Sequence, residues 1–297
     1  MKQTTLATLA ALGGYTIFGF SFLFSKLALD VTSPFNLLAI RFVLAFLTLN
    51  LILLSGRVRL DLKGKPLKML LILGLLQPIL YFLCENFGIA MTSTSFSGII
   101  LGMIPVIGLV MGRLMLGERC TTFQTACAVV SILGVALTSG GGDVSFSPIG
   151  IVLLFSAAVI NCLYSVISRS ISEQFTPFER TYVMFALGSA AFVLIALVQN
   201  RAAPAAILAP LQVPQFWISV IYLAVVSSVC AFLLLNYSMN YISVAKVSIF
   251  ANFSTVISVL AGIFIMGDAF SPIQLLGIVI ITLSVFGVSM PQKASRF

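Results

Sequence analysis

The sequence predicts an all-α membrane protein with ten transmembrane helices, built as two inverted five-helix repeats around a central cavity. Three observations predict this fold class: a low content of charged residues, ten apolar runs of membrane-spanning length, and a similarity between the two halves of the chain. The first observation indicates the solvent, the second indicates the elements, and the third indicates how they are arranged.

The composition indicates that most of the surface faces lipid. Of the 297 residues, 60% are hydrophobic and only 8% are charged, and the mean hydropathy is +1.16. Soluble domains carry about 25% charged residues. Because the deficit extends along the whole chain, we expect a protein that crosses the membrane several times.

Ten apolar runs are long enough to cross about 30 Å of hydrocarbon at a rise of 1.5 Å per residue. Their approximate limits are 5–29, 34–55, 67–90, 95–115, 121–139, 148–168, 178–199, 215–239, 244–266 and 271–290. The first run exceeds the apolar core of a signal peptide, which is about 7 to 15 residues long. We therefore expect it to be a span.

The basic residues predict the topology. With ten spans both termini share one side, and most of the 16 lysines and arginines fall on that side. They are Lys2, Arg57, Arg59, Lys63, Lys65, Lys68, Arg113, Arg119, Arg169, Arg180, Lys246, Lys293 and Arg296. The positive-inside rule makes that side cytoplasmic. The net charge of +8 is thus a topology signal, and no compact basic and aromatic patch indicates a nucleic-acid surface.

The second half of the chain repeats motifs of the first half. Residues 25–36 align with 168–179 at an offset of 143, where Pro34 matches Pro177. Residues 116–124 align with 266–274 at an offset of 150. The two offsets differ because the loop near Arg201 is longer than its counterpart.

The repeat predicts two units, 1–140 and 147–297, with five spans each. Because five is odd, the second unit enters the membrane from the opposite side, and the repeats are inverted. Inverted repeats are typical of secondary transporters, in which two similar halves open a central site alternately to each side. A duplicated scaffold without a transport role is the alternative.

Residues 89–137 resemble the fourth and fifth spans of an EamA-type module of the drug/metabolite transporter superfamily. The resemblance rests on a mid-span Pro105, the pair Gly117 and Glu118 at a helix end, and Gly134 in the following span. The segment 18–29 resembles the first span of that family. Its matching positions are Gly19, Phe22 and Lys26.

The sequence departs from the family pattern at three positions. Phe18 replaces a Trp, Thr255 stands where Pro105 would repeat, and Asp268 replaces a Glu. The motifs are specific for the fold and carry little information about the substrate.

The resemblance implies a ten-helix bundle in a bacterial cytoplasmic (inner) membrane that exports or exchanges small metabolites, often amino acids. Its partners would be a small-molecule substrate and the lipid bilayer, with protons as a candidate coupling ion, and the protein would be a monomer or a homodimer. Smaller members of the superfamily imply an alternative, a flippase for lipid-linked substrates.

Polar residues at helical spacing predict the walls of the cavity. In the third span the stripe is Gly74, Gln77, Tyr81, Glu85 and Gly88; in the sixth it is Ala157, Asn161, Tyr164 and Ser168; in the ninth it is Ser248, Asn252, Thr255 and Gly262. Pro78 removes a backbone bond and can kink the third span. The alternative is that the small and hydroxylated residues only allow close helix packing.

Glu85 stands in an apolar run, and Arg41 and Lys26 lie at comparable depth in the second and first spans. Ionised groups within membranes usually face protein or water and form pairs. Three roles stay open for Glu85: an ion pair, structural or gating, with one of the two bases, a direct contact with substrate or protons, and exposure at the interface. The substrate-binding or gating candidates are Glu85, Tyr81, Gln77, Arg41, Lys26, Asn161, Tyr164, Asn252 and Ser248.

Motifs of enzymes and of ATP-driven pumps are missing. The chain has no histidine and no GxSxG motif, and the Gly64-Lys65 pair lacks the flanking residues of a phosphate-binding loop. The acids and cysteines are too scattered for a catalytic metal site. We therefore expect no enzyme activity, cofactor or metal, and treat an intramembrane enzyme or a scaffold as the weaker alternatives.

Overall fold

The computed structural model describes residues 3–91, 100–138, 147–266 and 271–289, and within these ranges the chain forms helices and no strands. Seven of the described helical stretches are long and apolar enough to cross a membrane. They are Gln3–Leu29, Pro34–Leu54, Leu67–Gly88, Pro148–Ser170, Pro177–Gln199, Pro214–Ser238 and Val244–Ile265. Three shorter apolar helices are Ile104–Leu116, Thr122–Thr138 and Pro272–Val288. The all-helical membrane class is thus confirmed.

Several stretches consist of more than one element. In chain order the elements are α1 (Gln3–Leu29), α2 (Pro34–Leu54), α3 (Leu67–Gly74), η1 (Leu75–Leu80), α4 (Tyr81–Ala90), α6 (Ile104–Leu116), α7 (Thr122–Thr138), α8 (Pro148–Ser170), α9 (Pro177–Gln199), η2 (Pro204–Ile207), η3 (Ala209–Gln212), α10 (Pro214–Ile221), η4 (Tyr222–Cys230), α11 (Ala231–Ser238), α12 (Val244–Ala251), α13 (Phe253–Ala261), η5 (Gly262–Met266) and α14 (Pro272–Ser289). The elements η1, η4 and η5 are π-helical, and η2 and η3 are 3₁₀-helical.

Polar caps start α2 and α9 at matching positions of the repeat. The Ser33 hydroxyl accepts a bond from the backbone N–H of Asn36 at 3.4 Å, and Pro34 follows the cap. At the offset of 143, Thr176 and Glu179 form a capping box at the start of α9. Such side chains satisfy backbone N–H groups that the first helical turn leaves unbonded.

A second pair of caps matches at the offset of 150. The side chains of Thr121 and Gln124 bond each other's backbone N–H groups at the start of α7, at 3.1 and 3.0 Å. Ser271 and Gln274 do the same at the start of α14, at 3.2 and 3.1 Å. The local structure therefore repeats where the sequence repeats.

The third apolar run is interrupted as Pro78 predicts. Gln77 has non-helical angles, φ −139° and ψ 123°, within η1. Gly188 on α9 lies against the Pro78 ring so closely that no Cβ would fit without a shift. Proline removes a backbone bond, and the neighbouring glycine leaves space for the distorted turn.

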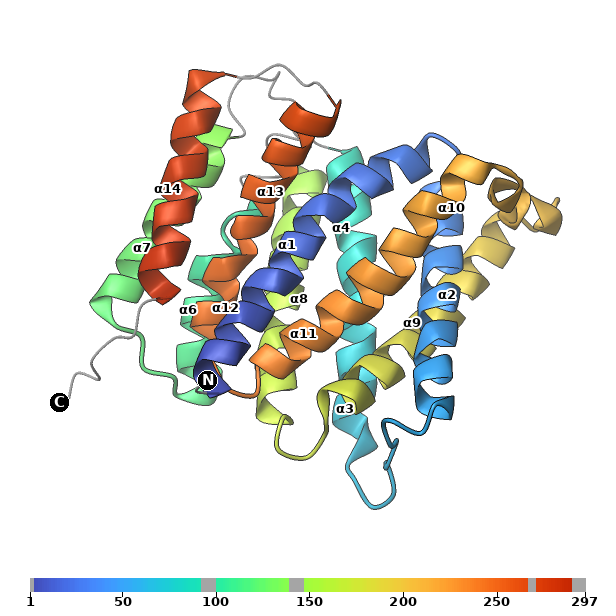
Figure 1. The fold of residues 1–297 in the computed structure, drawn as a ribbon, viewed down its shortest axis with the longest axis horizontal. Coiled ribbons are helices and arrows are strands. Elements are labelled where there is room, and N and C mark those ends of the chain that lie inside the picture. The colour runs from blue at the N-terminus through green and yellow to red at the C-terminus, as the bar shows by residue number, and fades with distance from the viewer. Residues whose placement is uncertain (1–2, 92–99, 139–146, 267–270, 290–297) are drawn as a thin grey trace.

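The helices form one bundle (Figure 1). At one flank α7 and α14 lie side by side, and at the other flank α2 packs against α9. Between the flanks α1 contacts α11 and α13, while α8 contacts α4 and α6. The α2–α3 loop and the α8–α9 loop lie at the same edge of the bundle (Figure 1), which allows contacts between them.

Candidate functional site

Glu85 forms a hydrogen bond within α4. The Tyr81 hydroxyl donates to Glu85 Oε1 at 2.7 Å, and both side chains are half-buried. Residues four apart share a helix face, so this contact follows directly from the predicted stripe. Among the described residues, neither Arg41 nor Lys26 forms an ion pair with Glu85. The gating ion pair therefore stays a prediction.

Arg41 is buried between α2 and η4, with 6% of its surface exposed. Its guanidinium donates to the hydroxyls of Ser228 and Ser227 at 2.9 and 3.2 Å. It also lies over the rings of Phe42 and Phe82, 5.6 and 5.4 Å from their centroids. These neutral partners keep the cation hydrogen-bonded and stacked on aromatic faces inside the bundle.

Arg41 and Glu85 are connected through two aromatic rings, because Arg41 lies over the Phe82 ring and Phe82 packs against Tyr81, the partner of Glu85. Tyr15 on α1 and Tyr164 on α8 are both buried, and ring contacts through Phe18 and Phe232 connect them. The structure thus brings together four of the predicted residues, from α2, α4 and α8, with α1 between them. Tyr15 is not among the nine substrate-binding or gating candidates.

Two other candidates lie apart from this group. Lys26 is exposed in the last turn of α1. Gln77 is buried at the helix break, with 4% of its surface exposed, and its Oε1 has no partner within the described residues. A buried acceptor without a donor is costly, so Gln77 is a position where a ligand N–H or O–H would be stabilising.

The sixth-span stripe leads into a polar network between α8, α9 and α11. The hydroxyls of Tyr164 and Ser168 donate to Asn236 Oδ1 at 3.1 and 2.7 Å, and the Asn236 amide donates to Thr181 at 3.0 Å. Asn161 lies half-buried on α8, about one turn before Tyr164. Buried amides and hydroxyls of this kind need such partners.

The ninth-span candidates make contacts between helices. The Asn252 amide, between α12 and α13, donates to the carbonyl of Gly102 at 3.3 Å and to Ser131 on α7 at 3.1 Å. Ser248 packs against Gly108 on α6, where a Cβ would clash. These contacts are of the helix-packing kind, and a place for either residue in a cavity wall stays a prediction.

Sequence reasoning missed Arg180 and Asn236 as site residues. Arg180 is fully buried, and its guanidinium donates to the backbone carbonyl and the hydroxyl of Ser168, both at 2.7 Å, and to the Asn236 carbonyl at 2.8 Å. Arg180 also bonds the side-chain oxygen of Asn240. Because Arg180 lies near the end of a predicted span, it counts in the sequence only as a basic residue that indicates the topology. Its hydrogen-bond partners come from other helices, which the sequence alone does not connect to it.

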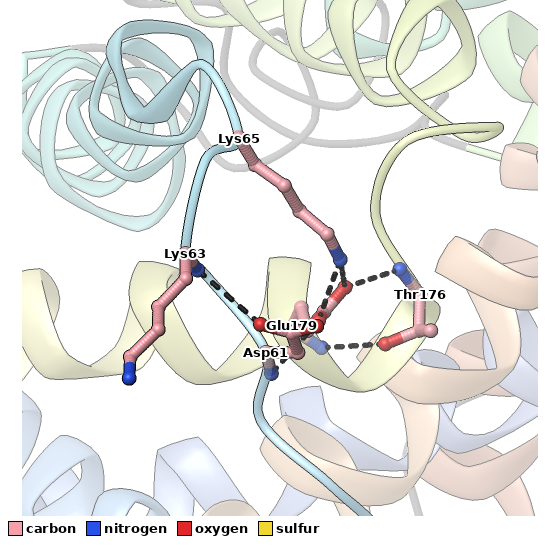
Figure 2. Close-up of polar contacts among 5 residues, drawn as sticks. All are labelled: Asp61, Lys63, Lys65, Thr176 and Glu179. Atoms are coloured by element: carbon pink, nitrogen blue, oxygen red, sulfur yellow. Dashed lines mark hydrogen bonds and ion pairs between the residues drawn. The ribbon is translucent and has the colours of Figure 1, made fainter.

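Glu179 joins the α2–α3 loop to the start of α9 (Figure 2). Its carboxylate accepts from Lys65 Nζ at 2.9 and 3.0 Å and from the backbone N–H groups of Asp61 and Thr176 at 3.1 and 2.8 Å. Lys65 Nζ also lies 5.3 Å from the centroid of the Phe175 ring. We call Asp61, Lys65, Thr176 and Glu179 the clasp.

One pocket among the described residues is not lined by these side chains. It measures about 390 Å³ and is lined by Phe35, Leu194, Ile195, Val198 and Gln199. It opens on an apolar face of α2 and α9, where a membrane protein meets lipid. In the described part of the chain, no three His, Cys, Asp or Glu side chains lie close enough to hold a metal ion.

An all-helical bundle with arginine, glutamate and amide side chains in its interior is typical of membrane transporters. The model of the EamA-like transporter family matches residues 5–140 and again 148–290. The chain therefore belongs to the EamA-like transporter family, and the predicted resemblance is confirmed.

The relatives agree with this membership. The chain is 34% identical to the "Uncharacterized transporter YcxC" of Bacillus subtilis (strain 168), over 99% of this chain and 96% of the relative. It is 24% identical to the "Uncharacterized transporter YyaM" of the same organism, over 93% and 91% of the two chains. A crystal structure with 19% identity has a TM-score of 0.79 and covers 95% of each chain, which shows the fold alone.

Proposed function

We propose that this protein is a secondary transporter that exports or exchanges small organic metabolites, amino acids or related compounds, across a bacterial cytoplasmic membrane by alternating access. The observation that carries the proposal is the pairing of Glu85 with Tyr81 beside the buried Arg41. Charged groups are expensive inside a membrane and mark substrate or ion pathways there. No nucleic acid or resident cofactor enters this function.

We infer alternating access from the predicted inverted repeat. The family model matches the chain twice, and the helix caps recur at the offsets of 143 and 150. The contacts also recur when the halves are exchanged, since α1 with α11 corresponds to α8 with α4, and α2 with η4 corresponds to α9 with η1. The seven long and three shorter apolar helices would then form ten spans in two five-helix units.

The partners of Arg41 and Glu85 suggest how one gate works. Each charge has neutral hydroxyl partners, Ser227 and Ser228 for Arg41 and Tyr81 for Glu85. Each of these bonds contains one charge, so exchanging the hydroxyls for the opposite charge replaces one charge-assisted bond with another. Closure of this end would bring Glu85 to Arg41, and opening would return each to its hydroxyls.

The test is uptake by proteoliposomes that contain the full chain. Amino acids, amines and nucleobases are offered with and without a pH gradient, beside empty liposomes. We expect the wild type to accumulate or exchange at least one compound. Glu85→Gln should slow this transport about tenfold, which corresponds to a change of about 1.4 kcal/mol between the two gate states. Glu173→Gln, which alters an exposed acid in the α8–α9 loop, is the matched control.

The outcomes separate the roles of Glu85. A slowed variant that keeps its response to the pH gradient identifies a gate, whereas a variant that loses this response but still exchanges substrate identifies a proton coupler. Unchanged rate and pH response would remove Glu85 from the mechanism. If the wild type transports nothing from the panel, the proposed substrate class is wrong.

A further inference from the structure

Arg180 is a buried cation that no acid neutralises within the described residues. Its side chain is completely buried, yet its bonds go to the neutral oxygens of Ser168, Asn236 and Asn240. Its Nε has no hydrogen-bond partner there. Taking a cation out of water costs several kcal/mol, and buried arginines are ordinarily paired. The carbonyls at the ends of α8 and α11 offset only part of that cost.

The neighbouring charged groups do not change this balance. Glu179, the adjacent acid, is engaged by Lys65 and by two backbone N–H groups. The other charged side chain near Arg180 is Arg169 on α8, which donates to the Met239 carbonyl at 2.6 Å. Two arginines thus surround the last turn of α11, with one acid that is already paired. The local charge favours an anion.

We propose that Arg180 binds a carboxylate of the transported solute, an inference that rests on the proposed transport function. A guanidinium binds a carboxylate with two parallel N–H···O bonds. The edge of Arg180 formed by Nε and Nη2 becomes available for this geometry when Asn240 moves away, because Nε is unpartnered and Nη2 donates to the Asn236 carbonyl and to the half-buried Asn240 side chain. Asn240 lies in the short turn between α11 and α12, and its amide oxygen occupies the place of one carboxylate oxygen.

The position of the site fits a solute that moves along the bundle. Asn236 connects Arg180 to Tyr164 through hydrogen bonds. Tyr164 is connected by ring contacts, through Phe232, Phe185, Phe42 and Phe82, to Tyr81, the partner of Glu85. Hydrogen bonds and aromatic contacts therefore connect the carboxylate site to Glu85. Movement of the turn that carries Asn240 would expose Arg180 to solutes on its side of the membrane.

The experiment measures binding to the purified full-length protein in detergent by thermal unfolding. L-amino acids, monocarboxylates and dicarboxylates are titrated at constant ionic strength, each beside its uncharged amide. We expect at least one carboxylate, and not its amide, to raise the unfolding temperature. Arg180→Gln should weaken this apparent affinity at least tenfold, and Arg169→Gln should weaken it less.

Asn240→Ala separates binding from a structural role. If Asn240 competes with the carboxylate, this variant should bind the same compound several-fold more tightly, although it loses a hydrogen bond. A merely structural Arg180 predicts lower stability and no gain in affinity. Should Arg180→Gln fail to fold, Arg180→Lys replaces it, since the ammonium keeps the charge and loses the two-bonded geometry.

Three results would overturn the proposal: no carboxylate in the panel binds, the affinity is unchanged without Arg180, or Asn240→Ala binds no more tightly. These results are independent of the transport assay. If a carboxylate binds in an Arg180-dependent way but the protein transports nothing, the binding site is supported and the proposed transport function is wrong. If the protein transports compounds that have no carboxylate and binds no carboxylate, the transport function is supported and the Arg180 site is wrong.

Discussion

Positions 180 and 37 match at the repeat offset of 143, and their surroundings are opposite in character. Arg180 lies among the hydroxyls, amides and carbonyls of α8, α9 and α11. Leu37 lies in an apolar cluster, and Arg180 has no counterpart there. The members of that cluster are Ala28, Leu37, Ile40, Phe216, Val220 and Leu223. The matched positions thus share their helix caps and differ in the side chains buried next to them.

The same contrast holds one residue earlier. Glu179 forms the ion pair of the clasp with Lys65, whereas its counterpart Asn36 accepts a neutral bond from the Asn200 amide at 2.8 Å. Charge-assisted hydrogen bonds are roughly twice as strong as neutral ones and respond to salt. One end of the bundle is thus held by charges and the other by burial and neutral amides. Substitutions at matched positions should therefore have unequal effects.

The largest effect should follow Leu37→Arg, which gives the apolar end the residue of the polar end. The buried members of this cluster are apolar, so a guanidinium there would be a buried cation without a charged partner, and we expect a loss of several kcal/mol and little folded protein. The measurement is the yield of monodisperse protein in detergent and its thermal unfolding. Leu37→Met, which should cost less than about 1.5 kcal/mol, is the control. A well-folded Leu37→Arg protein would show that the apolar end tolerates charge.

The next effect should come from Glu179→Gln, which removes the charge of the clasp. We expect a loss of about 2 kcal/mol, because the ion pair with Lys65 goes while a neutral acceptor remains for the backbone N–H groups. Denaturant titration in micelles measures it, and a double-mutant cycle with Lys65→Met should give a coupling of roughly 1 kcal/mol.

Lys63 supplies the matched control for the clasp. Its side chain is exposed and points away from Glu179 (Figure 2), although it lies only two residues from Lys65. Lys63→Met should therefore show no coupling with Glu179→Gln. If Lys63 and Lys65 show equal coupling with Glu179, the stabilisation comes from the net positive charge of the loop and not from the specific contacts of the clasp.

The smallest effect should come from Asn200→Ala at the neutral end. It removes the bond to Asn36, and we expect a loss of about 1 kcal/mol. Raising the salt concentration should reduce the coupling of Lys65 with Glu179 and leave the loss in Asn200→Ala unchanged. If salt changes the coupling of Lys65 with Glu179 and the stability loss in Asn200→Ala equally, the two ends do not differ in their dependence on charge.

Short-range features of the fold and site followed from the sequence. The apolar runs predicted the described helices to within a few residues, as 178–199 and α9 (Pro177–Gln199) illustrate, except for the run 95–115. The start of that run lies outside the described residues, and α6 begins at Ile104. Pro78 predicted the break in the third run, and the spacing of Tyr81 and Glu85 predicted that they share a face. These features depend on residues within about one helical turn, where backbone geometry determines what can meet.

Only the tertiary structure decided the partners of the charged residues. Arg41 bonds Ser228 across 187 positions and Lys65 bonds Glu179 across 114 positions, and no periodicity connects such residues. In the sequence Arg180 is one of many basic residues that indicate the topology. Its burial follows from the packing of α8 and α11 around it. Composition determined that the chain crosses a membrane and the family motifs indicated a transporter, because those signals add up along the chain. The identity of each buried charge's partner depends on which helices pack together, and packing is decided by the surfaces of all the helices at once.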